Sequence, residues 1–306
     1  MPLTWDQVSS ITEKKFIPKM VDNIFDSNAT LKFLMQKSKD IQDGGTSIIM
    51  PLIYATNTAA GWYNGADVLD VSDNEQFTGA EYNWKQHHVS ITITRREELR
   101  NAGSAGKLKL VTEKMSAAER TAKDAFGTAV YNTGADADAI AGLRQICALG
   151  NTVGGISQTT YAWWQSQVDS ATLTLTIPAM QTMFNLCSID NDSPDLIAVT
   201  RANYNRYYNL LQPAQRFMDT EMAKGGFSSL MFNGVPVVTD AKVPANGLFF
   251  LNSKYLKLIF HKDENFRFEP FAKPINQNVK VAHIYTMAGF GSCNNRMLGY
   301  MSAVAA

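Results

Sequence analysis

Length, composition and charge limit the kind of protein that this chain forms. The 306 residues carry 28 basic and 28 acidic side chains, and a formal net charge of zero argues against tight electrostatic binding of nucleic acid. Three separated cysteines without a CxxC pair indicate neither a disulfide framework nor a zinc site. No apolar run reaches the length of a membrane span and no secretory signal opens the chain, so we expect one large globular domain or two closely joined ones.

The first 43 residues have the pattern of an arm. A capping-box pattern at Thr4 predicts one short helix, and Pro18 is suited to open a second. Lysines make this segment locally basic, which is typical of a solvated face. We expect an N-terminal arm at residues 1–43.

A long hairpin is predicted at residues 44–95. From Gly44 the apolar period changes to two, so that residues 46–54 and 82–94 are predicted to be paired strands. In the second strand the apolar residues move from even to odd positions, which predicts a bulge or a change of face near residues 86–88. The connection at residues 55–81 is long, and connections of that length are usually functional.

The predicted hairpin tip is both apolar and acidic. Residues 55–81 contain no Lys or Arg, and a protruding tip must bury its apolar side chains against something. The apolar residues are Trp62, Tyr63, Val68, Leu69, Val71 and Phe77, and the acids are Asp67, Asp70, Asp73, Glu75 and Glu81. Where its own body is out of reach the partner is another chain, so we expect an intermolecular contact.

One long helix is predicted at residues 107–131. Small or apolar residues recur at steps of three and four and form a single stripe, namely Leu108, Val111, Met115, Ala118, Ala122, Phe126 and Ala129. Its outer face has two pairs at i,i+4 spacing, Glu119–Lys123 and Arg120–Asp124. Such a helix is roughly 37 Å long, enough to cross a small domain.

The rest of the chain alternates between helices and short strands. Pro178 opens a predicted helix, 195–200 is a buried strand, and Asn233-Gly234 within 229–240 indicates a hairpin. Further strands are expected at 247–252 and 255–260, and 278–304 is expected to return to the first block. This order predicts an α+β fold in which one domain interrupts another.

The sequence offers no convincing active site. His87 and His88 are adjacent in a strand and therefore point to opposite faces, while His261 and His283 are isolated. The acidic residues at 190–195 lack the closing glycine and glutamate of an EF-hand. No GxSxG, HExxH or Walker lysine loop is present. We therefore expect no catalytic residues, no metal and no cofactor.

The order of elements resembles the major capsid proteins of tailed bacteriophages, with the Hong Kong 97-like fold. The segments that carry the resemblance are Gly44-Gly45 before the hairpin, residues 131–134 with Gly142-Leu143, residues 207–216, 225–226 and 230–240, Leu251-Asn252 with Tyr255-Leu256, and Cys293-Asn294-Asn295. The resemblance extends over nearly the whole chain.

The resemblance implies a division of the chain into four parts. It implies an N-terminal arm at 1–43, an extended loop at 44–95, a peripheral domain at 96–149 and 256–306 with a spine helix at 107–131, and an axial domain at 150–255. Some family members cross-link a loop lysine to a neighbour's asparagine with the help of a glutamate. This tip has no lysine and no acid follows Glu269, so we expect no such cross-link.

The implied function is structural rather than enzymatic. Such a subunit assembles as hexamers and pentamers into the icosahedral head, within the host bacterial cytoplasm, and ends in the virion. The implied partners are a separate scaffolding protein, a portal, decoration proteins and packaged double-stranded DNA that is contacted non-specifically, with no membrane. An encapsulin-type nanocompartment shell shares the fold and is the alternative, and a monomeric binding module is a third.

The charge distribution adds a contact hypothesis. The tip is acidic and the chain after Glu269 is basic, so we expect Asp67, Asp70, Asp73 and Glu75 to dock near Lys273, Lys280 or Arg296 of a neighbour. Exposed ion pairs contribute only about 0–1 kcal/mol each. Trp62, Tyr63 and Phe77 should therefore supply most of the affinity.

Overall fold

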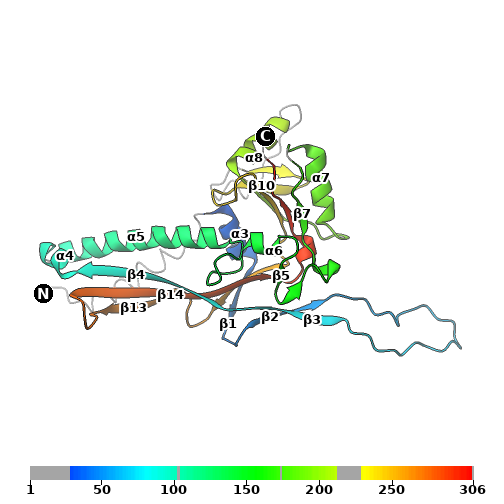
Figure 1. The fold of residues 1–306 in the computed structure, drawn as a ribbon, viewed down its shortest axis with the longest axis horizontal. Helices are drawn as coiled ribbons and strands as arrows, with labels where there is room; N and C mark the ends of the chain where they lie inside the picture. The colour runs from blue at the N-terminus through cyan, green and yellow to red at the C-terminus, as the bar shows by residue number, and fades with distance from the viewer. Residues whose placement is uncertain (1–27, 102–103, 173, 212–228, 305–306) are drawn as a thin grey trace.

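The molecule is elongated, with a hairpin projecting from one end. Its structure is a computed structural model that describes residues 28–101, 104–172, 174–211 and 229–304. In Figure 1 the hairpin lies at one end of the long axis and the helix α4 (Arg95–Arg100) at the other. The two short helices predicted within the arm lie outside the described residues.

A five-stranded sheet forms the elongated part of the body. Its strands are β1 (Lys39–Gln42), β12 (Leu256–His261), β14 (Val279–Ser292), β13 (Arg267–Ala272) and β4 (Lys85–Thr94). The long strand β14 pairs antiparallel with β4, β12 and β13, and β1 lies parallel to β12.

The predicted long helix is confirmed as α5 (Ser104–Ala129), which runs beside β4 and β14 (Figure 1). Its stripe from Val111 to Phe126 is buried against the sheet, because side chains three and four residues apart share one face. Glu119 and Lys123 pair at 2.9 Å as predicted, whereas Asp124 pairs with Lys242 rather than with Arg120. Among the described residues no helix is long and apolar enough to cross a membrane.

A six-stranded sheet forms the second layer. In order across the sheet its strands are β7 (Gln167–Asp169), β15 (Gly299–Met301), β11 (Leu248–Leu251), β8 (Leu196–Val199), β10 (Val235–Thr239) and β9 (Ser229–Phe232). One face packs on α7 (Ile177–Leu186) and α8 (Arg201–Leu210), and the other face joins the core that also lies under α5. The Asn233-Gly234 hairpin is confirmed, with both residues at positive φ.

Shorter elements connect these layers. They are α3 (Ala29–Lys37), β2 (Ile48–Ile53), β3 (Phe77–Tyr82), α6 (Leu143–Ile146), β5 (Thr152–Val153), β6 (Ile156–Ser157), and the 3-10 turns η2 (Ala162–Trp164) and η3 (Asn295–Met297). The C-terminal segment divides between the sheets: β14 returns to the first sheet as predicted, whereas β15 pairs with β11 and β7 of the second.

The predicted pairing of the hairpin is wrong in one respect. β2 pairs with the short strand β3, which ends at Tyr82, and not with residues 85–94, because the second strand breaks at residues 83–84. On one side of this break Ala80 and Tyr82 are buried, and on the other side Val89, Ile91 and Ile93 are buried. The change of face is therefore confirmed, but it lies at the break, and beyond it β4 pairs with β14.

Candidate interaction surface

The root of the hairpin is fixed to the body through Tyr82. The Tyr82 hydroxyl donates to the carbonyl of Ser292 at 2.7 Å and accepts from the Ser292 amide at 3.0 Å. A β-carbon on Gly291 would lie 2.6 Å from the Tyr82 ring, so only glycine leaves room for that ring. On the same face Ile48, Met50 and Leu52 are buried, as the apolar period of two in this strand indicates.

An aromatic groove flanks this root. Tyr54 stacks on Trp163 with ring centroids 5.1 Å apart, and the ring of Tyr161 is tilted against Trp163 with centroids 5.8 Å apart. Together with Glu75 and Glu81 these rings line a cavity of about 410 Å³. The stacking holds the hairpin to the segment that follows α6.

The opposite face of the hairpin is apolar and uncovered. Ile53 is 71% exposed and its cross-strand neighbour Phe77 is 66% exposed, with Ile49 exposed on the same face. The strand β2 is apolar at every position. A continuous apolar run of this kind is typical of strands that are buried on both faces. Ile49 and Ile53 were not among the predicted contact residues.

The tip continues this uncovered surface. Between β2 and β3 the side chains of Trp62 and Val68 are fully exposed, and Tyr63 and Leu69 are more than half exposed. A contiguous apolar surface of this kind indicates an interaction site.

The acids of the tip shape its turns. Asp67 accepts a hydrogen bond from the Asn64 amide at 2.8 Å, and Asp70 accepts bonds from the hydroxyl and the amide of Ser72. The Ser72 hydroxyl and then its amide lower the pKa of Asp70, so this carboxylate stays charged near neutral pH. Asp73 and Glu75 are exposed and have no ion-pair partner among the described residues.

The predicted basic partners lie apart from the tip, and Arg296 also lies apart from the other two, which are close together at the β13–β14 turn. Lys273 is exposed at the turn between β13 and β14, and Lys280 at the start of β14 is half-buried and pairs with Glu98 at 3.1 Å. Arg296 is exposed on η3, between the two sheets. Within one chain the β13–β14 turn and the tip are at opposite ends of the long axis (Figure 1), so no intramolecular contact joins them.

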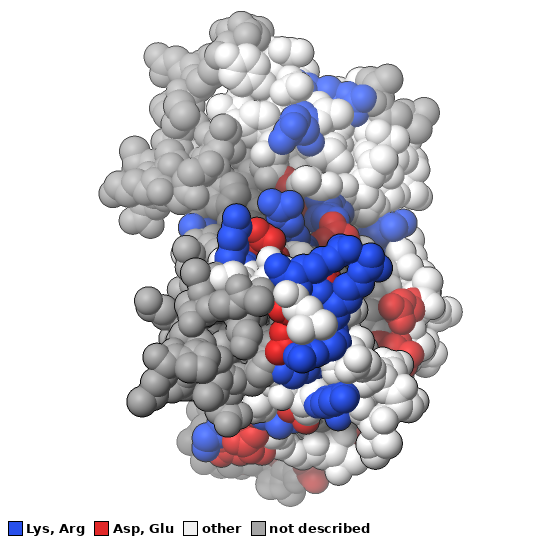
Figure 2. Space-filling view, turned by 90° about the vertical axis from the view of Figure 1, so that its left-hand side faces the viewer, with Lys and Arg blue, Asp and Glu red and all other residues white. Residues whose placement is uncertain are grey.

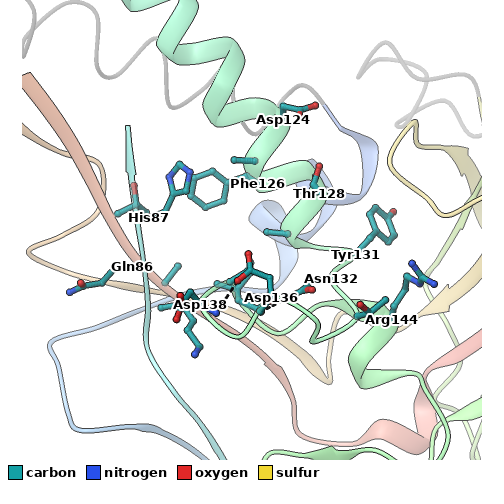
Figure 3. A pocket seen from close by; sticks show the side chains of 18 residues that line it. Gln86, His87, Asp124, Phe126, Thr128, Tyr131, Asn132, Asp136, Asp138 and Arg144 are labelled. Carbon is teal, nitrogen blue, oxygen red and sulfur yellow. Dashed lines mark hydrogen bonds between the residues drawn. The ribbon is translucent and has the colours of Figure 1, made fainter. Parts of the chain in front are cut away.

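A cavity of about 620 Å³ lies beside the C-terminal end of α5 and the start of β4. Figure 3 shows His87 directed toward Phe126, with ring centroids 5.1 Å apart, and Asp136 and Asp138 on the loop below. Burial, with a smaller contribution from His88, lowers the pKa of His87, so this imidazole is neutral at pH 7. His88 points to the opposite exposed face, as predicted.

This cavity has the properties of a packing cleft. Its Asp124 is paired with Lys242, and Lys85 donates to the Ala137 carbonyl. In the part of the chain that the structure describes, no three His, Cys, Asp or Glu side chains are grouped so as to hold a metal ion.

The sequence matches no family model and no curated protein, but the fold has many solved relatives. The chain is similar to a subunit of the cyanophage A-1(L) capsid (TM-score 0.66, 15% identity, covering 90% of this chain and 93% of that one). It is also similar to the capsid of an empty GTA particle (TM-score 0.61, 14% identity, 89% of each chain). A third similar structure is the SrpI encapsulin of Synechococcus elongatus (TM-score 0.56, 11% identity, 90% and 87%).

These similarities define a class. The chain has the mixed α+β fold of phage capsid proteins, as its sequence predicts, and the similarity covers about nine-tenths of the chain. The solved structures that it resembles are shell proteins and not enzymes.

Proposed function

We propose that this chain is the major capsid protein of a tailed double-stranded DNA phage, with the Hong Kong 97-like fold, assembling as hexamers and pentamers into an icosahedral head. The observation that carries the proposal is a capsid fold along about nine-tenths of the chain, combined with a projecting hairpin whose outer face is apolar and uncovered. In a monomeric protein the apolar outer face of the hairpin would stay exposed to water, whereas a shell subunit buries it against a neighbouring subunit.

The proposal assigns a role to each part of the chain. Residues 1–43 form the arm and 44–95 the extended loop; 96–149 and 256–306 form the peripheral domain around the spine helix α5, and 150–255 form the axial domain. Within this division, β15 of the peripheral part pairs with β11 of the proposed axial domain and so joins the two parts. A scaffolding protein, a portal, decoration proteins and non-specifically contacted DNA complete the proposed set of partners, with assembly in the host cytoplasm.

The proposed contact surface is the hairpin. Trp62, Tyr63 and Phe77 contribute the buried area, and the acids Asp67, Asp70, Asp73 and Glu75 orient the contact, since exposed charges add little affinity singly. The exposure of all three aromatic side chains supports this division of roles.

A second candidate is a nanocompartment shell of the encapsulin type, which the similarity to the SrpI encapsulin favours. The two candidates differ in what the particle encloses, DNA or cargo protein.

Electron microscopy of the purified recombinant chain tests the proposal. We expect closed shells, or tubes and rings of subunits, at protein concentrations at which a 34 kDa monomer would elute alone from a sizing column. A uniform monomer with and without co-expressed phage assembly proteins would refute the shell function. Particles recovered from infected or induced cells that contain protein cargo and no DNA would select the second candidate.

A further inference from the structure

The aromatic groove beside the hairpin root has walls from two separate segments. The hairpin contributes Tyr54, Glu75 and Glu81, and the segment that follows β6 contributes Tyr161 and Trp163. The cavity between them, of about 410 Å³, has the size of a small-molecule site, for which the range is roughly 300–1,000 Å³. Among the described residues that line it, none is Lys, Arg or His.

Backbone hydrogen bonds fix these two segments beside each other. The Glu81 amide donates to the Gly154 carbonyl at 2.9 Å, and the Tyr54 amide donates to the Gln76 carbonyl at 3.0 Å. A β-carbon on Gly154 would lie 2.7 Å from that of Ala80, so the turn between β5 and β6 approaches β3 closely. The groove is therefore formed by the fold itself.

The aromatic side chains of the groove have polar groups without protein partners. The hydroxyls of Tyr54 and Tyr161 and the indole N–H of Trp163 make no hydrogen bond with the described residues. Tyr161 is 47% exposed, so part of its ring is open to a ligand. The face of an aromatic ring attracts a cation, and most strongly when the ring is that of Trp or Tyr.

The two carboxylates of the groove are far apart and uncompensated. Glu75 and Glu81 are six positions apart on an extended segment, so their α-carbons are roughly 20 Å apart. Neither has an ion-pair partner among the described residues. Figure 2 shows Lys and Arg side chains gathered across the end of the molecule that α4 forms, and the hairpin lies at the other end (Figure 1).

We infer that the aromatic groove binds a linear aliphatic polyamine. Ammonium groups near the two ends of the ligand pair with Glu75 and Glu81, and its methylene chain lies on the aromatic rings. The ligand contacts both the hairpin and the segment after β6, so its binding holds the hairpin root more tightly to the body. This site is separate from the proposed shell function and does not depend on it.

The spacing of the carboxylates favours a long cation over two others. A metal ion binds carboxylate oxygens within about 2.6 Å, so one ion does not bridge Glu75 and Glu81. A single ammonium group, such as that of a lysine side chain, pairs with one carboxylate and leaves the other without a partner. A polyamine satisfies both carboxylates and also covers apolar ring surface.

Calorimetric titration of the purified chain with spermine, a linear tetraamine, tests this inference. We expect saturable binding of one spermine per chain. Butylamine, which carries one ammonium group, is expected to bind at least about tenfold more weakly, since it pairs with only one carboxylate. Hydrogen exchange gives the location: spermine should slow exchange of the β3 amides and leave those of β8 unchanged.

Matched variants separate the groove from diffuse attraction of cations. Glu75→Gln and Glu81→Gln should each lower the affinity for spermine at least about tenfold, because each removes one charged hydrogen-bond acceptor. Asp73→Asn removes the same charge at an exposed tip residue outside the groove and should leave the affinity within about twofold. Tyr161→Leu should weaken binding about fivefold, whereas Tyr161→Phe keeps the ring and should retain it.

Thermal unfolding and sizing chromatography check that each variant is folded and has the oligomeric state of the wild type. These checks are needed because Glu75 is also among the acids that we propose orient the hairpin contact.

Each remaining outcome overturns the inference. Butylamine that binds as tightly as spermine would assign the groove to a single ammonium group, such as a partner's lysine. Equal losses in Asp73→Asn and Glu81→Gln would show diffuse attraction only, and the absence of saturable binding would exclude the site. Any of these results leaves the shell function standing, whereas a chain that stays monomeric and binds spermine would refute the shell function and keep the site.

Discussion

Tyr131 joins three separate parts of the chain. Its hydroxyl lies 2.7 Å from that of Thr30, on α3, and donates to Asp240, which follows β10, at 3.2 Å. Burial and the nearby Asp240 charge raise the pKa of Tyr131, so the phenol remains protonated and can act as this donor. A buried polar cluster of this kind holds its elements in one arrangement.

Removing the Tyr131 hydroxyl should lower the free energy of unfolding. Tyr131→Phe removes the contact of the buried Thr30 hydroxyl and one of the hydrogen bonds of Asp240, whose other oxygen still accepts from the Lys242 amide. We expect the free energy of unfolding to fall by about 1–3 kcal/mol. Urea unfolding measures this change. Tyr204→Phe, at a half-buried site on α8, is the matched control, and equal losses in the two variants would contradict the role given to Tyr131.

Gly291 leaves the space in which the Tyr82 ring packs at the root of the hairpin. Gly291→Ala places a methyl group against the Tyr82 ring, which must then move away from Ser292, and overpacking of this kind costs about 1–3 kcal/mol. We expect faster hydrogen exchange of the β2 and β3 amides. Gly61→Ala, at an open position in the tip, should leave exchange unchanged, and a similar effect at both sites would refute the steric explanation.

At the scale of the element, the two faces of the hairpin serve different purposes. The inner face, with Met50 and Leu52, packs on the chain's own body, and the outer face, with Ile53 and Phe77, is uncovered. Stability of the subunit should therefore depend on one face and association on the other.

Substitutions on each face should separate these properties. Ile53→Thr with Phe77→Thr keeps strand propensity and should change the free energy of unfolding by less than about 0.5 kcal/mol while reducing particle yield. Met50→Ala should instead cost about 2–5 kcal/mol of stability. Sizing chromatography and urea unfolding measure the two effects. An outer-face variant that assembles normally would remove the hairpin from the interface.

Much of the element order could be predicted from the sequence because local signals were strong. The stripe of α5, the Asn233-Gly234 turn and the apolar run of β2 each depend on neighbours within a few residues. The partner of residues 85–94 could not be predicted, because periodicity reports which face is buried and not which strand lies alongside. The break at 83–84 was visible only as a change from even to odd positions.

At the scale of the whole molecule, the contact surfaces were predictable in part. The apolar, acidic tip was evident, since residues 55–81 lack any Lys or Arg. The cations that stay exposed on α4 and on the β13–β14 turn were not, because these two segments are far apart in sequence and the pairing of Glu98 with Arg95 and Lys280 changes which cations remain exposed. The net charge of a segment, counted from its sequence, does not show whether side chains of a distant segment neutralise it.

The pairing of β4 with β14 also sets an order of events during synthesis. Glu98 and Lys280 are 182 positions apart, and the strands that bring them together cannot pair until β14, which ends at Ser292, has left the ribosome. Contacts so distant in sequence form late in folding. The hairpin tip is therefore made early, whereas the sheet that holds α4 beside the β13–β14 turn takes shape only after residue 292 has emerged.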